Sequence, residues 1–164
     1  VQLMASRTYI SITGQKQGLI SEGCSSKLSI GEKCQADHSD EIIVLSLSHT
    51  ISSIEQTTDA IHQPVVITKY IDKSSPLLAQ ALTDREIIDC EIILYRESSL
   101  GTQEKFYTIK LEGAVIAAKN LNMPNILLGG NAEMEEQIAI RYRTITWTHH
   151  KGNTTGSTSW SDSE

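Results

Sequence analysis

Apolar and polar residues alternate along most of this chain, which is typical of strands that bury one face. Ile10 and Ile12 alternate with polar residues before Gly14 and predict a short first strand. Similar alternation predicts further strands at 41–51, 61–71, 88–95, 107–116 and 138–147. We therefore expect a mainly β domain, a single antiparallel β-barrel or sandwich.

Two of these strands carry further detail. In 41–51 the apolar face, expected to meet the core, holds Ile43, Leu45 and Leu47, and the polar face, expected to point away from it, holds Ser46, Ser48 and Thr50. Near Arg143 the apolar positions change parity, which predicts a β-bulge because one extra residue reverses the facing of every residue after it.

One short helix is predicted, from about Pro76 to Asp84. Ser75 is placed to accept hydrogen bonds from first-turn amides, and Pro76 fits the first helical position. Leu78 and Leu82 share a face. Because so short a helix is not stable alone, we expect these leucines to dock on the sheet.

The remaining segments are rich in turn-forming residues. Gln15 to Asp40 is predicted to be a long loop, and loops of this length in compact domains are usually functional. Ala117 to Glu136 is predicted to form turns, with helix an open alternative for part of it. We expect one domain over 4–150, a mobile tail over 151–164, and an upstream extension in residues 1–3, before Met4.

Composition excludes several classes of protein. The chain has 164 residues, 39% of them apolar, and a net charge of −6 without any run of Lys and Arg, which argues against nucleic-acid binding. No apolar stretch approaches the roughly 20 residues that span a bilayer, and no secretory signal begins the chain. We therefore expect the chain to be made in the cytoplasm and not to insert into a membrane.

Candidate chemistry is sparse. Cys24, Cys34 and Cys90 match no disulfide framework or zinc spacing, and the five histidines have no partner at catalytic spacing. Ser74-Ser75 lies in no nucleophile elbow, and Asp89 with Glu91 fits the solvated face of a strand. We expect no metal, no cofactor and no catalytic residues.

The chain resembles the haemolysin-coregulated protein (Hcp) family, the inner-tube protein of bacterial type VI secretion. The most specific matching segment is Lys69-Tyr70-Ile71-Asp72-Lys73-Ser74-Ser75-Pro76-Leu77-Leu78. Other matches are Ile12 with Gly14, Gln17-Gly18-Leu19-Ile20, Gly23-Cys24-Ser25-Ser26, Asp40-Glu41-Ile42, Leu82-Thr83-Asp84, Lys105-Phe106-Tyr107-Thr108-Ile109 and Arg141-Tyr142-Arg143-Thr144-Ile145-Thr146-Trp147. The region Ala117 to Glu136 departs most from the family pattern.

The resemblance implies a barrel of two sheets with one flanking helix, and six copies that close into a ring. Rings of this family stack into a tube that is expelled from the bacterial cytoplasm into the surroundings or a target cell. The implied partners are further copies of the chain, a spike protein, a sheath and effector proteins carried or chaperoned in the lumen.

Two sets of residues are our candidates for assembly. The ring-stacking candidates lie in the long loop: Gly18, Leu19, Ile20, Cys24, Ser25 and Ser26. The lumen-lining candidates are Ser46, Ser48 and Thr50, because a passage for varied cargo should be polar and weakly adhesive. Two alternatives stay open, a small-ligand-binding barrel and a secreted effector enzyme.

Overall fold

The computed structural model describes residues 7–55, 59–128 and 133–160. Its helical elements are α1 (Lys27–Ile30), α2 (Ser74–Thr83) and the 3-10 turns η1 (Gly31–Lys33) and η2 (Ala36–His38). Its strands are β1 (Arg7–Gly14), β2 (Gly18–Leu19), β3 (Ile42–Ser48), β4 (Ile51–Ser52), β5 (Ile61–His62), β6 (Val65–Tyr70), β7 (Ile88–Glu97), β8 (Gln103–Asn122), β9 (Glu135–Arg141), β10 (Thr144–His149) and β11 (Thr154–Ser159). The protein is mainly β, as predicted.

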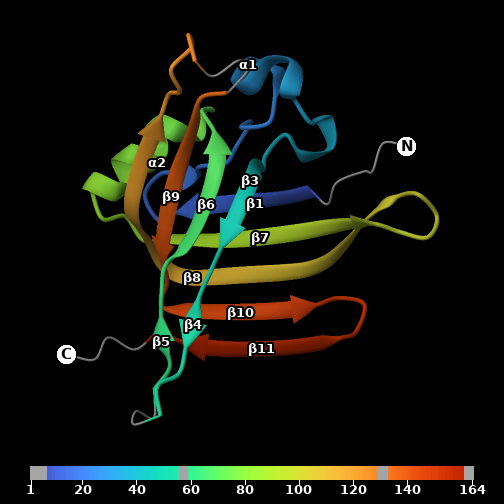
Figure 1. Cartoon of the computed structure of the whole chain (residues 1–164), viewed down its shortest axis with the longest axis vertical. Helices are drawn as coiled ribbons and strands as arrows, with labels where there is room; N and C mark the ends of the chain where they lie inside the picture. The colour runs from blue at the N-terminus through green and yellow to red at the C-terminus, as the bar shows by residue number, and fades with distance from the viewer. Residues whose placement is uncertain (1–6, 56–58, 129–132, 161–164) are drawn as a thin grey trace.

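The strands close on themselves through β8. The order β8-β7-β1-β3-β6-β9 returns to β8, which pairs with β7 in its first part and with β9 in its second. Between the two parts Gly113 has φ of +60°, and a Cβ there would lie 3.1 Å from Cβ of Arg143. Glycine therefore fits where β8 changes partners and bends upward beside β9 (Figure 1). β10 and β11 extend the sheet beyond β8.

The core fills the space inside this ring of strands. Its fully buried side chains include Ile10, Ile12, Ile42, Ile67, Ile92, Leu111, Ile138 and Ile140. α2 covers one end of the barrel, where Leu78 and Ala81 are also fully buried and Leu82 packs at their edge. The sequence expectation that this helix docks its leucines on the sheet is confirmed.

Strand β3 corrects part of the predicted facing. Ile42 and Val44 point into the core, whereas Ile43 is half-buried and Leu45 is exposed. The pairing of β3 with β6 shifts between Val44 and Ser46, and this irregularity returns Leu47 to the core side. The facing predicted for Leu47 is therefore right, and that for Ile43 and Leu45 is wrong.

Three predicted irregular segments contain regular structure. The long loop includes β2 and the four-residue helix α1, so the predicted single helix has a second, shorter companion. β8 continues to Asn122, six residues into the segment predicted to turn. Thr154–Ser159 of the predicted mobile tail is β11, paired residue by residue with β10. All six residues of β11 are exposed, so no apolar alternation marks the strand.

Candidate assembly surfaces

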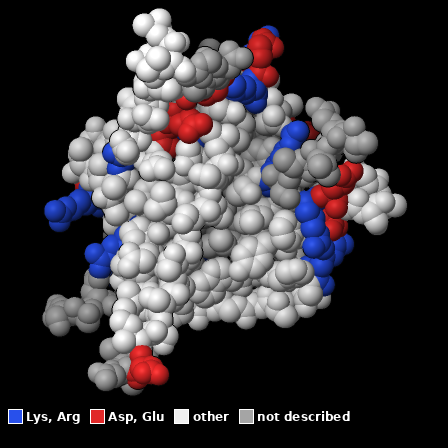
Figure 2. All heavy atoms as spheres, in the orientation of Figure 1, with Lys and Arg blue, Asp and Glu red and all other residues white. Residues whose placement is uncertain are grey.

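An uncharged face covers the outside of the β3-β6-β9 sheet. Register places its side chains opposite one another: Ser46 faces Thr68, Ser48 faces Val66, and Gln137 and Ala139 lie beside them on β9. Ala118 and Asn120 continue the row on β8. Figure 2 shows this area of the surface free of Lys, Arg, Asp and Glu. We call this set of small or neutral residues the neutral face.

A buried ion-pair network lies beneath α2 at one end of the barrel. Lys69 and Glu136 are paired across β6 and β9, and both side chains are fully buried. Lys69 Nζ lies 2.6 Å from Glu136 Oε1 and 3.0 Å from Asp72 Oδ1. Ser75 Oγ donates to Glu136 Oε1 at 2.8 Å, which joins the helix to the strand. The network fastens α2 to the barrel wall.

The charges of this network are balanced. Burial by itself would raise the pKa of Glu136, but the hydrogen bonds from Lys119 and Lys69 outweigh it and hold that pKa below its usual value. Lys119 Nζ lies 2.7 Å from the second carboxylate oxygen, Oε2. A buried carboxylate with two ammonium partners stays ionised at neutral pH.

The side chain that accepts a backbone N–H in the first turn of α2 is that of Asp72 and not that of Ser75. The carboxylate of Asp72 accepts bonds from the backbone N–H and the hydroxyl of Ser74. Ser75 is the second residue of the helix and Pro76 the third. The cap predicted at Ser75 is corrected, because its hydroxyl belongs to the buried network and also accepts the backbone N–H of Asp72. Pro76 still lies in the first turn, where amides lack helical partners.

A second polar cluster ties the β4-β5 ribbon to the barrel. The Tyr142 hydroxyl lies 2.9 Å from Nε2 of His49 and 2.6 Å from Nδ1 of His62. Trp160 stacks on His62, and the guanidinium of Arg141 lies 4.8 Å from the Trp160 ring centre. Burial raises the pKa of Tyr142 to about 12. The neutral phenol can donate to one imidazole and accept from the other.

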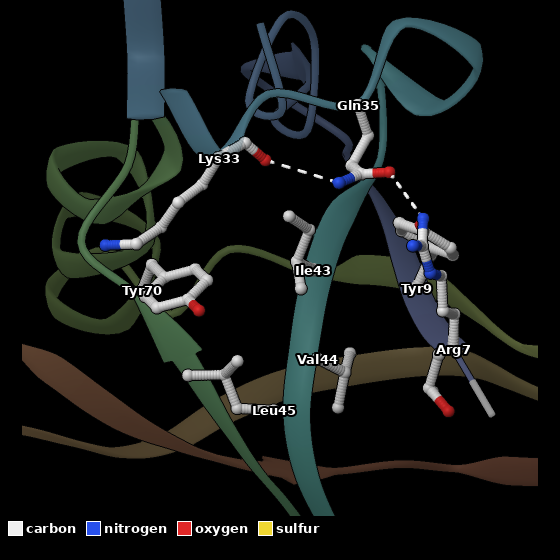
Figure 3. A pocket seen from close by; sticks show the side chains of 9 residues that line it. Arg7, Tyr9, Lys33, Gln35, Ile43, Val44, Leu45 and Tyr70 are labelled. Atoms are coloured by element: carbon white, nitrogen blue, oxygen red, sulfur yellow. Dashed lines mark hydrogen bonds between the residues drawn. The ribbon is translucent and has the colours of Figure 1, made fainter. Parts of the chain in front are cut away.

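A recess of about 480 Å³ lies beside β1, β3 and β6. Figure 3 shows Arg7 and Lys33 on either side of it, with Tyr70 below Lys33 and Ile43 between them. Arg7 donates to the Gln35 side chain at 2.8 Å, and Lys33 Nζ lies 4.7 Å from the Tyr70 ring centre. Among the described residues that line this recess, none is a carboxylate, a histidine or a cysteine.

The cysteines are separate from one another. Cys24 and Cys90 are buried and Cys34 is exposed, all three as free thiols. Burial raises the pKa of Cys24 to about 11 and that of Cys90 further, so both stay protonated at neutral pH. Within residues 7–55, 59–128 and 133–160 no three His, Cys, Asp or Glu side chains group as metal ligands. In the same ranges no helix has the length and apolarity to cross a bilayer.

Comparison with known proteins identifies the family. The family model described as "Type VI secretion system effector, Hcp" matches residues 9–149. This chain belongs to the Hcp family. The "Major exported protein" of Pseudomonas aeruginosa PAO1 is 43% identical over 96% of both chains. "Uncharacterized protein YhhZ" of Escherichia coli K12 is 32% identical over 92% of this chain but only 37% of its own length.

Solved Hcp structures share this fold. A crystal structure of an Hcp protein has a TM-score of 0.91 and 34% identity, covering 96% of this chain and 99% of that one. The secreted protein Hcp3 of Pseudomonas aeruginosa has a TM-score of 0.85 and 41% identity, covering 96% and 100%. The specific run from Lys69 to Leu78 now has a physical role in this Hcp chain, since it supplies Lys69, Asp72 and Ser75 to the buried network.

The two predicted assembly sets differ in accessibility. Ser46, Ser48 and Thr50 are all exposed, and the two serines lie on the neutral face. In the loop set Gly18 and Leu19 are exposed and Ser26 is half-buried, whereas Ile20, Cys24 and Ser25 are buried within the subunit. These three side chains are not accessible to a partner in this structure. Gly18 and Leu19, together with the edge of Ser26, are what the predicted loop offers to a partner.

Sequence reasoning missed the His49–Tyr142–His62 cluster. Tyr142 is 93 positions from His49 and 80 from His62, so no local spacing relates them. The signal that could have found them is weak: His49 and His62 lie near predicted strand ends, and Tyr142 lies within the predicted strand 138–147. The fold brings them together because His49 precedes β4, His62 ends β5, and Tyr142 follows β9.

Proposed function

We propose that this chain is the tube subunit of a type VI secretion system. Six copies close into a ring, rings stack, and the exported tube carries or chaperones effectors in its lumen. The role is architectural and involves no catalysis. A spike protein at the tip, a surrounding sheath and effector proteins are the remaining partners, and the tube leaves the bacterial cytoplasm for the exterior or a target cell.

The neutral face is the observation that carries this proposal beyond family membership. The exposed Ser46, Ser48 and Gln137 offer hydrogen bonds without charge or large apolar surface, so a protein passing them meets no strong attraction. Turned inward in a ring, the face would give a wet and weakly adhesive lumen. The name "Major exported protein" of the 43% identical relative supports the export step.

Ring closure requires a heterologous contact, in which one surface of each copy meets a different surface of the next. Among the described strands β11 pairs on one edge only, with β10, and its free edge can accept further backbone bonds. Leu19, 40% exposed on β2, is the accessible apolar side chain of the predicted stacking loop.

Light scattering and negative-stain electron microscopy test the ring. We expect a particle of six times the 18.1 kDa chain mass, with a central hole. A particle that stays at 18.1 kDa at high concentration and shows no rings would contradict the proposal. Leu19→Asp tests the role of the loop in stacking. Ile20 is left unchanged, because a charge at this buried position would disrupt the core. If rings of the Leu19→Asp variant stacked as wild type does, the loop would not be part of the stacking contact.

A further inference from the structure

The β4-β5 ribbon has no hydrogen-bonded ladder to the barrel. Among the described strands, β4 and β5 pair only with each other, Ile51 with His62 and Ser52 with Ile61. The ribbon follows β3 and leads into β6, and Figure 1 shows it beyond the end of the barrel. Because a two-stranded ribbon is at best marginally stable alone, its order depends on side chains at its base.

The side chains of His49, Tyr142 and His62 join this base to the barrel through a chain of hydrogen bonds. Burial lowers the pKa of His49 and a bond with the Gln63 backbone opposes it, so in that bond the imidazole donates its N–H to the carbonyl. Nε2 of His49 is then unprotonated and accepts the Tyr142 hydroxyl at 2.9 Å. The phenol oxygen in turn accepts Nδ1–H of His62 at 2.6 Å. We call these three side chains the clasp.

A further proton on His49 breaks this chain of bonds. At Nε2 it would point at the hydroxyl proton of Tyr142, and the hydroxyl would have to turn away from His49. His62 offers no acceptor in exchange, because its Nδ1 already carries a proton in this contact. Tyr142 is only 2% exposed, so its displaced proton would stay unsatisfied, and a buried donor without a partner is costly. The clasp therefore keeps its full set of bonds only while His49 is neutral.

The groups around the clasp also oppose an added positive charge. His62, on the other side of the phenol, is 7% exposed, and Trp160 stacks on it with ring centres 5.8 Å apart. The guanidinium of Arg141 lies 4.8 Å from the Trp160 ring centre and is a fixed positive charge beside this stack. Burial raises the pKa of Tyr142 to about 12, so the phenol stays neutral and supplies no compensating negative charge. A proton on either imidazole is therefore added next to a like charge.

We propose that the clasp is an acid-opened device that releases the β4-β5 ribbon from the barrel. Uptake of one proton by His49 breaks the bond to Tyr142, and the ribbon swings away on the links that join it to β3 and β6. The apolar core of the barrel stays intact, because none of its side chains takes part in the clasp. The inference goes beyond the proposed tube and concerns the single subunit in a mildly acidic environment.

Hydrogen exchange of the full chain, read by mass spectrometry from pH 8 to 5 and corrected for the intrinsic rate, tests the clasp. In wild type the protection of 49–52 and 61–63 should fall toward acid by up to about tenfold per pH unit, the limit for one bound proton. β1 should keep its protection. His49→Gln can still accept the Tyr142 hydroxyl but takes up no proton, so its ribbon should stay protected. His38→Gln is the matched control, because His38 contacts Glu41 at 3.1 Å away from the ribbon, and it should behave as wild type.

Three results would overturn the inference. They are an acid dependence in His49→Gln as steep as in wild type, an unchanged wild-type ribbon at pH 5, and an equal loss of protection in β1, which would mean that the whole barrel unfolds. Tyr142→Phe gives a readout in the other direction: without the phenol oxygen the ribbon should exchange at pH 8 as fast as wild type does at pH 5. A ribbon still protected in that variant would contradict the role of Tyr142. None of these results depends on ring formation, so failure here leaves the proposed function untouched.

Discussion

Lys69 and Glu136 face each other across β6 and β9 at 2.6 Å, with neither side chain reaching solvent. The sequence places two charges on the core face of strands whose other inward residues are apolar, such as Ile67 and Ile138. Their burial is tolerated because Ser75 donates a hydrogen bond to Glu136, and because Asp72 and Lys119 balance the charge. The pair therefore makes the position of α2 depend on strands from two parts of the chain.

Removing one partner of this pair should destabilise the fold strongly. Lys69→Met leaves Glu136 and Asp72 buried without their ammonium, and we expect a loss of about 3–5 kcal/mol in the free energy of unfolding, measured with urea. Lys105→Met is the control, since its 3.6 Å pair with Glu91 is about 40% exposed, and about 1 kcal/mol or less is expected. Equal losses for the two variants would contradict the role of the network.

The same carboxyl predicts an acid-sensitive stability. The pKa of Glu136 is lower in the folded chain than the usual 4.5. Its stabilising contribution is therefore complete above about pH 4.5 and is lost as the pH falls toward the folded-state pKa. Between pH 3 and 6, the unfolding midpoint should fall more steeply with decreasing pH in wild type than in the Glu136→Gln variant. Identical slopes would mean that other carboxyls cause the acid transition.

His49 should destabilise the ribbon in mild acid. Burial, helped by the nearby His62, lowers the pKa of His49 below 6.5 against an opposing bond involving the Gln63 backbone. The unfolded chain then binds more protons, so stability falls as the pH drops from above 6.5 toward the lower folded-state pKa. We expect that His49→Gln removes this part of the dependence when unfolding is measured from pH 8 to 5. A variant slope as steep as that of wild type would refute it.

The helix offers a matched pair of leucines. Leu78 is fully buried and adjacent Leu77 is 38% exposed. Leu78→Ala should lower the free energy of unfolding by about 2–5 kcal/mol because a cavity opens beneath α2. Leu77→Ala should cost less than about 1 kcal/mol, and thermal or urea unfolding distinguishes them. Similar losses would show that α2 is not docked through Leu78.

Gold labelling would locate the neutral face in the assembled ring. We expect Ser46→Cys, combined with Cys34→Ser and labelled with a maleimide gold cluster, to place density at the ring centre in electron micrographs. Thr102→Cys in the β7-β8 turn, which is also exposed to solvent, is the control outside the proposed lumen. Gold at the rim for Ser46→Cys would exclude the neutral face from the lumen.

Local patterns predicted the elements whose inner and outer faces differ in polarity. Ile10 and Ile12 in β1, and Leu78 in α2, follow this rule. β11 was not predicted because both of its faces meet solvent, so its sequence shows no alternation of apolar and polar residues. The facing of Ile43 and Leu45 was wrong because the irregularity after Val44 depends on pairing with β6, a contact between distant residues.

The candidate site was predictable in outline only. The polar alternation along β3 predicted that Ser46 and Ser48 face away from the core, and both are exposed, whereas their place in a lumen stays a prediction. The buried Lys69 could not be recognised, since a lysine in a strand usually indicates solvent and its partner Glu136 lies 67 positions away. Ile20, Cys24 and Ser25 were grouped with an exposed loop because sequence does not show that this loop folds back onto the barrel.

β8 also determines how the subunit would bear mechanical load. Its 20 residues pair with β7 and β10 in the first part and with β9 in the second. Ladder bonds run across a strand, so tension along β8 loads many of them in shear at once, while peeling would break them one by one. A pull on either end of this strand is shared by β7, β9 and β10, and the barrel should yield as a unit before any single strand separates.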